Sequence, residues 1–110
     1  MGVENTDLLE QNDSEIFKIE GDLSILNIDE FRENLIKLID SKNNLVLDCS
    51  KLESIDLSIV QLIISLILER NNIGFSTKVD YSDNELITIF FNKTGLSQVF
   101  NKITKSNKNE

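Results

Sequence analysis

Residues 43–68, NNLVLDCSKLESIDLSIVQLIISLIL, decide the fold class of this chain. Within them, residues 45–47 are too few and too apolar for a helix, so they predict a central strand that is covered on both faces. A short polar link follows this strand. From residue 57 to about residue 71 the sequence is helical and apolar around most of its circumference. The stretch therefore predicts a buried strand that leads into a buried helix.

The residues before this stretch predict a strand and a helix. Residues 16–20 partly alternate between apolar and polar side chains, which predicts a strand, and residues 21–24 are expected to form the turn at its end. Apolar residues then recur at helical spacing from residue 28 to about residue 41. Asn27 and Glu30 have the spacing of a capping box at the start of this helix. Strand, helix and strand in this order predict a parallel crossover.

The residues after the stretch continue the alternation. Residues 75–79 predict a strand, and Ser82 with Glu85 repeats the capping-box spacing before a third helix. Gly95 is expected to end that helix as a left-handed cap, and residues 96–103 are expected to add a short strand or turn. The expected apolar face of the third helix consists of Leu86, Ile87, Phe90 and Phe91.

The order of these elements predicts an α/β fold with a mostly parallel sheet covered by helices. At 110 residues, the chain has the length of one domain. We expect this domain to span residues 14–103 and a polar tail to follow over residues 104–110. Residues 1–13 are expected either to supply a short edge strand or to stay loose.

Composition and charge exclude several classes of function. A formal net charge of -8 disfavours binding to nucleic acid and to anionic membranes, and favours a protein partner with a basic face. The chain has no histidine and a single cysteine, Cys49, which we expect to be buried and unreactive beside Asp48. No metal, cofactor or catalytic residue is therefore expected. No secretory signal is visible, and Gln61 and Ser65 interrupt the longest apolar stretch, which favours a cytoplasmic protein without membrane insertion.

Polar residues mark the start and one side of the long helix. Asp56 stands at the position of the helix cap, where its carboxylate can accept backbone amide hydrogens. At about 100° per residue, Ser58 falls on one narrow stripe together with three polar residues further along the helix. These three residues are Gln61, Ser65 and Glu69. The rest of the circumference is apolar and has to pack on flanking helices or on another protein.

Ser58 lies in the first turn of this helix, where free amide hydrogens and the helix dipole favour a negative substituent. A phosphate there would add about -1.5 to -2 charges beside Asp56 and change what this surface can bind. A serine in the first turn is also a good helix starter, so residue type alone leaves both interpretations open.

Three segments resemble the STAS domains, the sulfate transporter and anti-sigma factor antagonist family. Residues 45–67, LVLDCSKLESIDLSIVQLIISLI, resemble the family signature. Residues 19–39, IEGDLSILNIDEFRENLIKLI, resemble its glycine-containing turn and first helix, and residues 90–100, FFNKTGLSQVF, the end of its last helix. The resemblance covers about residues 14–103. It implies a sheet of four or five strands, mostly parallel or mixed, with helices stacked on one face.

The resemblance also implies a regulatory function. In bacterial members that act as anti-sigma factor antagonists, a partner kinase phosphorylates a serine two positions after the signature aspartate. The matching residues here are Asp56 and Ser58. Leu57 and Ile59 replace the small hydroxyl residue and the glycine that usually flank that serine. The unphosphorylated protein would bind and sequester the kinase, and phosphorylation would release it.

We therefore expect a non-enzymatic module that binds a protein partner, with Ser58 as the candidate phosphorylation site. The resemblance points to a serine kinase, an anti-sigma factor or a phosphatase as the partner, and it leaves a homodimer open. The expected partner-binding residues are Asp22, Ser24, Asp56, Leu57, Ser58, Ile59, Gln61 and Leu62.

Three other functions remain as alternatives. The first is a constitutive, unphosphorylated subunit of a transporter ATPase or of a chemotaxis or other signalling complex, with a permanent interface on Val60, Ile64 and Ile67. The second is an enzyme, which is disfavoured because the chain lacks a nucleophile and base pair. The carboxylates that such an enzyme could use are Asp22, Asp48 and Asp56. The third, small-molecule sensing, rests on family analogy alone.

Overall fold

Three parallel strands form the main sheet of the computed structural model, which describes residues 14–105. The strands β1 (Ser14–Lys18), β3 (Asn44–Asp48) and β5 (Thr77–Asp80) lie in the order β1-β3-β5. The segment 45–47 therefore lies in the central strand of this sheet, as the sequence predicts. The expected edge strand within residues 1–13 lies outside the described residues.

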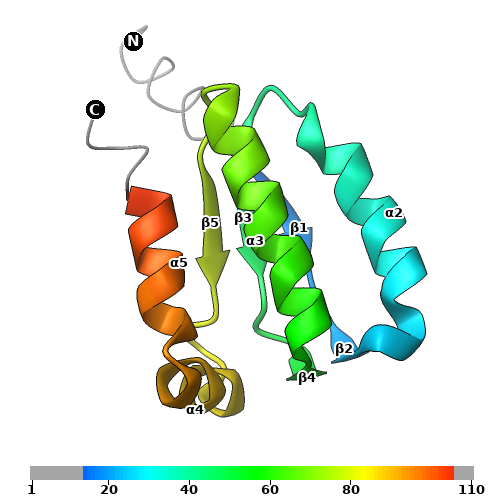
Figure 1. Cartoon of the computed structure of the whole chain (residues 1–110), viewed down its shortest axis with the longest axis vertical. Coiled ribbons are helices and arrows are strands. Elements are labelled where there is room, and N and C mark those ends of the chain that lie inside the picture. Colours follow the sequence, from blue (N-terminus) through cyan, green and yellow to red (C-terminus); the bar gives the residue numbers. More distant parts are fainter. Residues whose placement is uncertain (1–13, 106–110) are drawn as a thin grey trace, which may run out of the picture.

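A second, smaller sheet continues from the first. The strands β2 (Gly21–Leu23) and β4 (Leu52–Ile55) pair in parallel (Figure 1). The sequence predicted a turn where β2 lies and a polar link where β4 lies. Both predictions are wrong. Each segment is only three or four residues long and too polar to show a strand pattern alone, and each becomes a strand by pairing with the other. Gly21 has a φ of 80°, which a residue with a side chain rarely adopts, and it marks the register shift where β2 begins.

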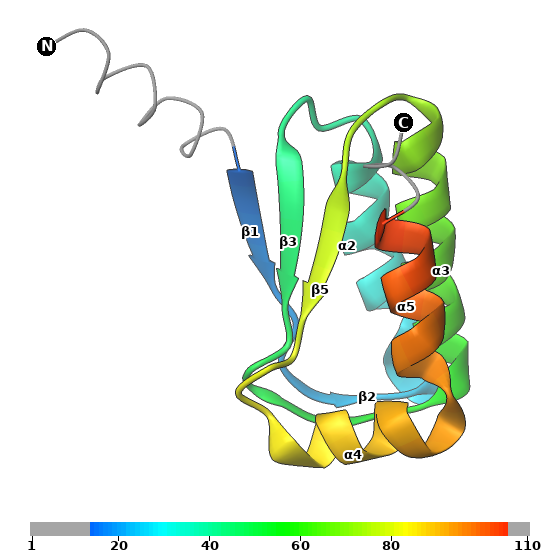
Figure 2. The same ribbon diagram turned by 90° about the vertical axis from the view of Figure 1, so that its left-hand side faces the viewer.

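The helices cover one face of the main sheet. Figure 2 shows α2 (Ile28–Ile39), α3 (Leu57–Asn72) and α5 (Leu96–Lys105) on the same side of the strands. In Figure 1, α3 lies between α2 and α5, so its apolar circumference packs on the sheet and on two neighbouring helices. The short helix α4 (Glu85–Thr94) lies across the lower end of the molecule against β4.

The opposite face of the main sheet has no helix over it within residues 14–105 (Figure 2). Leu45 and Leu47 are buried, whereas Val46 between them is only partly buried and pairs with the exposed Ile16 of β1. The prediction that this strand is covered on both faces is therefore wrong. A run of three apolar residues favours full burial, but only the placement of the helices decides it.

The start of α2 is held by a cap that the sequence reading missed. A short 3-10 helix, η1 (Ile25–Asn27), precedes α2. The hydroxyl oxygen of Ser24 accepts from the backbone N–H of Leu26 at 3.1 Å, and the side-chain oxygen of Asn27 accepts from the N–H of Ser24 at 2.9 Å. Because Asn27 closes this box, the predicted box with Glu30 is wrong, although α2 begins at the expected residue.

The start of α4 is capped by Asn84 and not by Ser82. The Asn84 side-chain oxygen accepts from the N–H of Ile87 at 3.2 Å. Its amide group donates to the carbonyl of Cys49 at 2.9 Å and to that of Leu52 at 2.7 Å. The hydroxyl of Ser82, the predicted cap, donates instead to the carboxylate of Asp80 at the end of β5. Asn84 thus both caps α4 and fixes it to the link between β3 and β4.

Helix α4, the third helix that the sequence predicts, packs through fewer residues than expected. Ile87 and Phe91 are buried, and the Phe91 ring lies 4.7 Å from the ring of Tyr81 in a T-shaped contact and 5.1 Å from that of Phe100. Leu86 is exposed, so the prediction that it belongs to the apolar face is wrong. The aromatic contacts join α4 to the end of β5 and to α5.

The prediction of a short strand or turn over residues 96–103 is also wrong, because these residues belong to helix α5. Leu96, Phe100 and Ile103 have helical spacing and pack against the core, a signal that was present in the sequence. Gly95 ends α4 with a φ of 80°, which confirms the predicted left-handed cap.

Arg70, near the end of α3, is 0% exposed. Its Nε donates to the hydroxyl of Thr77 at 2.7 Å, and its Nη1 donates to the carbonyls of Leu38 at 2.9 Å and Ser41 at 3.0 Å. Its Nη2 donates to the carbonyl of Asn43. The guanidinium therefore joins α3 to β5 and to the end of α2, where backbone carbonyls favour a positive charge.

Candidate functional site

The start of α3 is organised by the carboxylate of Asp56. Its Oδ1 accepts from the backbone N–H of Ile59 at 3.2 Å and from the hydroxyl of Ser58 at 2.6 Å. Its Oδ2 accepts from the backbone N–H of Ile25 at 2.9 Å. The prediction that Asp56 caps this helix is confirmed, and the third contact shows that it also reaches the turn before α2.

These hydrogen bonds keep Asp56 ionised. The bond from Ser58, together with the backbone N–H groups of Ile25 and Ile59, holds the pKa of the Asp56 carboxyl below its usual value. At neutral pH the group is therefore negative and acts only as an acceptor. A second negative charge on the neighbouring hydroxyl would face this carboxylate directly.

Three exposed apolar side chains belong to the two segments that Asp56 joins. Ile25 is 60% exposed, Leu26 93% and Leu57 59%. Ile25 is tied to Asp56 by its backbone, and Leu57 follows Asp56 in sequence. We call these three side chains, together with the half-buried Ser58, the docking surface. Apolar groups gathered at one place on a surface are typical of a protein-interaction site.

The structure leaves seven of the eight expected partner-binding residues exposed or partly buried. Gln61 is exposed, Leu62 and Ser24 are partly buried, and Asp22 is exposed and accepts a hydrogen bond from Ser54 of β4. Ile59 is the exception, because its side chain is fully buried in the core and cannot face a partner.

Sequence reasoning missed two residues of the docking surface. Ile25 and Leu26 are adjacent apolar residues between the polar Ser24 and Asn27, and neither side chain is buried in the core. That pattern in a turn was the available signal, because apolar residues in an exposed turn have no packing role.

The polar stripe along α3 is confirmed. Gln61, Ser65 and Glu69 are exposed, in line with the half-buried Ser58. By contrast, Val60 and Ile67 are fully buried inside the domain. The alternative interpretation placed a permanent interface on these two residues and on Ile64, which is only partly buried and packs against the core. The three residues therefore do not form an exposed interface.

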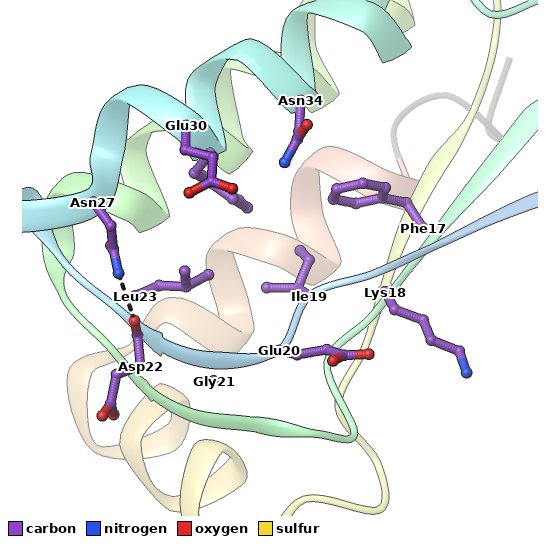
Figure 3. Close-up of a pocket in the computed structure, with 11 residues that line it drawn as sticks. Phe17, Lys18, Ile19, Glu20, Gly21, Asp22, Leu23, Asn27, Glu30 and Asn34 are labelled. Atoms are coloured by element: carbon purple, nitrogen blue, oxygen red, sulfur yellow. Dashed lines mark hydrogen bonds between the residues drawn. The ribbon is translucent and has the colours of Figure 1, made fainter.

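A hollow of about 490 Å³ lies next to the docking surface, between the β1–β2 edge and α2 (Figure 3). Ile19 points into it from the link between β1 and β2, Leu23 from β2, and Glu30 from α2. The Asn27 amide donates to the backbone carbonyl of Asp22 at 2.9 Å and closes its end near the turn. The acidic residues that line the hollow, Glu20, Asp22 and Glu30, favour a basic group on a molecule that approaches this side.

The three carboxylates that an enzyme could have used do not form one cluster. Asp22 lies on the small sheet, and Asp56 follows β4. Asp48 ends β3 of the main sheet, where it pairs in register with Lys18 and Asp80. Within residues 14–105, no group of three metal-binding side chains is present, and no helix is long and apolar enough to span a membrane.

Cys49 is buried, as predicted. Burial, together with the negative charges of Asp48 and Asp80, raises the pKa of its thiol to about 12. Because the thiolate is the reactive form, a thiol reagent at mildly alkaline pH is expected to modify the folded chain at least about 100-fold more slowly than the denatured chain. Equal rates in a colorimetric thiol assay with and without denaturant would contradict this.

A family model of the STAS domain matches residues 5–109. The chain belongs to the STAS family. The match covers nearly the whole chain and agrees with the α/β fold, the parallel strands and the helices on one face that the structure shows. A search of curated proteins gave no match. STAS membership indicates an anti-sigma factor antagonist-like or related regulatory module.

Proposed function

We propose that this STAS protein is a non-enzymatic, cytoplasmic regulatory module that binds a protein partner through the docking surface, and that phosphorylation of Ser58 switches the binding. The observation that carries this proposal is that Ser58 shares the carboxylate of Asp56 with the backbone of the exposed Ile25, next in sequence to the exposed Leu26, and that the exposed Leu57 precedes Ser58. A change of charge at this hydroxyl alters the centre of the apolar surface.

The partner that fits is a serine kinase or anti-sigma factor with an apolar cleft and a basic rim. Three exposed apolar side chains require an apolar counterpart, because burying them against polar groups would leave those groups without hydrogen bonds. Asp22 and Glu53 are exposed on the neighbouring small sheet, and the whole chain has a net charge of -8. Basic groups around the cleft would speed association with such a surface.

Phosphorylation opposes this contact in two ways. A phosphate on Ser58 adds about -1.5 to -2 charges at the centre of an interface that has to lose its water. It also lies beside Asp56, which already carries a negative charge. The unmodified protein is therefore the binding form, and phosphorylation by the kinase releases the partner.

A second candidate function is a constitutive subunit of a transporter ATPase or of a chemotaxis complex. The exposure of Leu57 supports it, because a large apolar side chain next to Ser58 suits a permanent contact. In this case the same docking surface is used and Ser58 is never modified.

The two functions differ in their response to charge at Ser58. A partner is first captured by affinity pull-down with the full chain, identified and purified, and its dissociation constant is then measured for each variant. Ser58→Ala is expected to bind within about threefold of the unchanged protein, and Ser58→Asp at least about 30-fold more weakly, as for a charge buried in an interface without a partner.

Ser65→Asp serves as the matched control, because it adds the same charge on the same stripe of α3, two turns away from Ser58. It is expected to bind within about threefold of the unchanged protein. Equal binding by Ser58→Asp would overturn the switch and leave the constitutive subunit. Phosphosite mapping of the captured protein gives a second, independent result.

A further inference from the structure

We propose that Asp56 is a positioning residue that latches the turn of residues 24–27 to the start of α3, and that phosphorylation of Ser58 opens this latch. The inference rests on the proposed function, because it describes how the same site would be regulated. The proposed function involves a change of charge at Ser58, and the latch adds a change in the position of the turn of residues 24–27.

The latch consists of hydrogen bonds between segments far apart in sequence. Ile25 donates its backbone N–H to Oδ2 of Asp56 at 2.9 Å, across 31 positions of the chain. The backbone N–H of Asp56 donates to the carbonyl of Leu23 at 3.2 Å, just before the turn. The carboxylate therefore holds the turn with one oxygen while its other oxygen caps α3 and accepts from Ser58.

The turn runs from the end of β2 at Leu23 to the start of α2 at Ile28, so secondary structure holds both of its ends. Its remaining hydrogen bonds within the described residues, such as those between Ser24 and Asn27, join positions at most five apart. Ile25 and Leu26 are exposed, so burial contributes little to their placement. Between the two held ends, the bond from Ile25 to Asp56 is the long-range hydrogen bond described for residues 24–27.

Phosphorylation removes one contact of Asp56 and turns another into repulsion. The Oγ of Ser58 bonds to the γ-phosphorus of a nucleoside triphosphate, the bond from that phosphorus to the diphosphate breaks, and the hydroxyl proton passes to a base of the kinase. Oδ1 of Asp56 then loses its donor at 2.6 Å and faces a phosphate instead. The phosphate can itself accept from N–H groups at the start of α3, so it competes with Oδ1 of Asp56 for the N–H of Ile59.

The carboxylate of Asp56 is therefore displaced from the helix end by a stronger anion. When it turns away, Oδ2 no longer accepts from Ile25, and the turn keeps only its local hydrogen bonds. Ile25 and Leu26 lose their fixed positions, and the docking surface loses the shape that a partner recognises.

Hydrogen exchange of backbone amides, measured by NMR on the isolated full chain, tests the latch without any partner. The compared proteins are the unchanged chain, the chain with phosphoserine incorporated at position 58, Ser58→Ala and Asp56→Ala. The Ile25 amide is expected to exchange about tenfold faster in the phosphoserine protein and in Asp56→Ala, the effect of one lost hydrogen bond, and within about threefold of normal in Ser58→Ala.

The amide of Leu47, in the central strand, shows in each protein whether the fold as a whole is intact. Unchanged protection of Ile25 in the phosphoserine protein, with Leu47 also unchanged, would overturn the latch. Failure of the latch can be distinguished from failure of the proposed function. If Ser58→Asp abolishes partner binding while the phosphoserine protein keeps Ile25 protected, the switch stands and the latch fails. If the latch opens but binding does not change, the proposed function fails.

Discussion

Replacing Arg70 with methionine is expected to lower the free energy of unfolding by about 3–5 kcal/mol. Methionine fills a similar volume, but it leaves the carbonyls of Leu38, Ser41 and Asn43 and the hydroxyl of Thr77 without their buried donor. Each of these groups would lose a hydrogen bond to a charged group, which is stronger than one to a neutral group. Urea denaturation followed by circular dichroism measures the loss.

Arg32→Met is the matched control for this prediction. Arg32 is exposed and pairs with the neighbouring Asp29 at 3.1 Å, so its replacement is expected to cost less than about 0.5 kcal/mol. Arg70→Lys should fall between the two variants, because one ammonium group cannot reach acceptors on three segments as a planar guanidinium does. Equal stability of Arg70→Met and Arg32→Met would show that the buried network contributes nothing.

Asn84→Asp is expected to destabilise the fold by about 2–4 kcal/mol, although aspartate is as good a helix cap as asparagine. The carboxylate can still accept from the N–H of Ile87, so the cap itself is preserved. It can no longer donate to the carbonyls of Cys49 and Leu52, and three acceptors then face one another in a buried site.

The destabilisation by Asn84→Asp should shrink as the pH falls. Burial beside two carbonyls raises the pKa of the new carboxyl in the folded state, so proton binding favours folding and restores one donor. Ser82→Ala, at the predicted but unused cap, is expected to change stability by less than about 0.5 kcal/mol at any pH. Urea denaturation at neutral and acidic pH compares both variants. An Asn84→Asp protein as stable as the unchanged one at neutral pH would contradict the role of the two donated bonds.

The parts of the fold that could be predicted are those with a long or strong local pattern. The helix that became α3 is apolar over four turns, and its cap, Asp56, needs only the backbone next to it. Gly95 was predictable for the same reason, because its left-handed conformation is a local property of glycine. The family resemblance gave the same architecture independently.

The parts that could not be predicted depend on contacts between distant segments. The strands β2 and β4 exist because each pairs with the other across about 30 residues, and neither is long enough to alternate. Arg70 looks like an ordinary charged residue near a helix end, and only the meeting of α2, α3 and β5 makes it a buried donor. Asn84 replaced Ser82 as a cap because its amide has carbonyl partners in the folded chain.

The candidate site was half predictable. Asp56 and Ser58 follow from helix geometry and from the resemblance, and the structure brings them into contact. Ile59 was misplaced because one step of about 100° along the helix turns its side chain from the surface into the core. Ile25 and Leu26 were missed because their position beside Asp56 depends on a hydrogen bond across 31 positions.

Helix α3 is anchored at one end and carries the proposed docking surface at the other. Arg70 fixes the end of the helix to three segments, while Ser58 lies at its start, about 18 Å away at 1.5 Å per residue. Substitutions that are far apart and share no contacts have nearly independent effects on stability. The exposed Leu57, at the start of α3, and Leu26, in η1, can therefore change with little effect on the scaffold, which leaves the proposed docking surface able to vary independently of the fold.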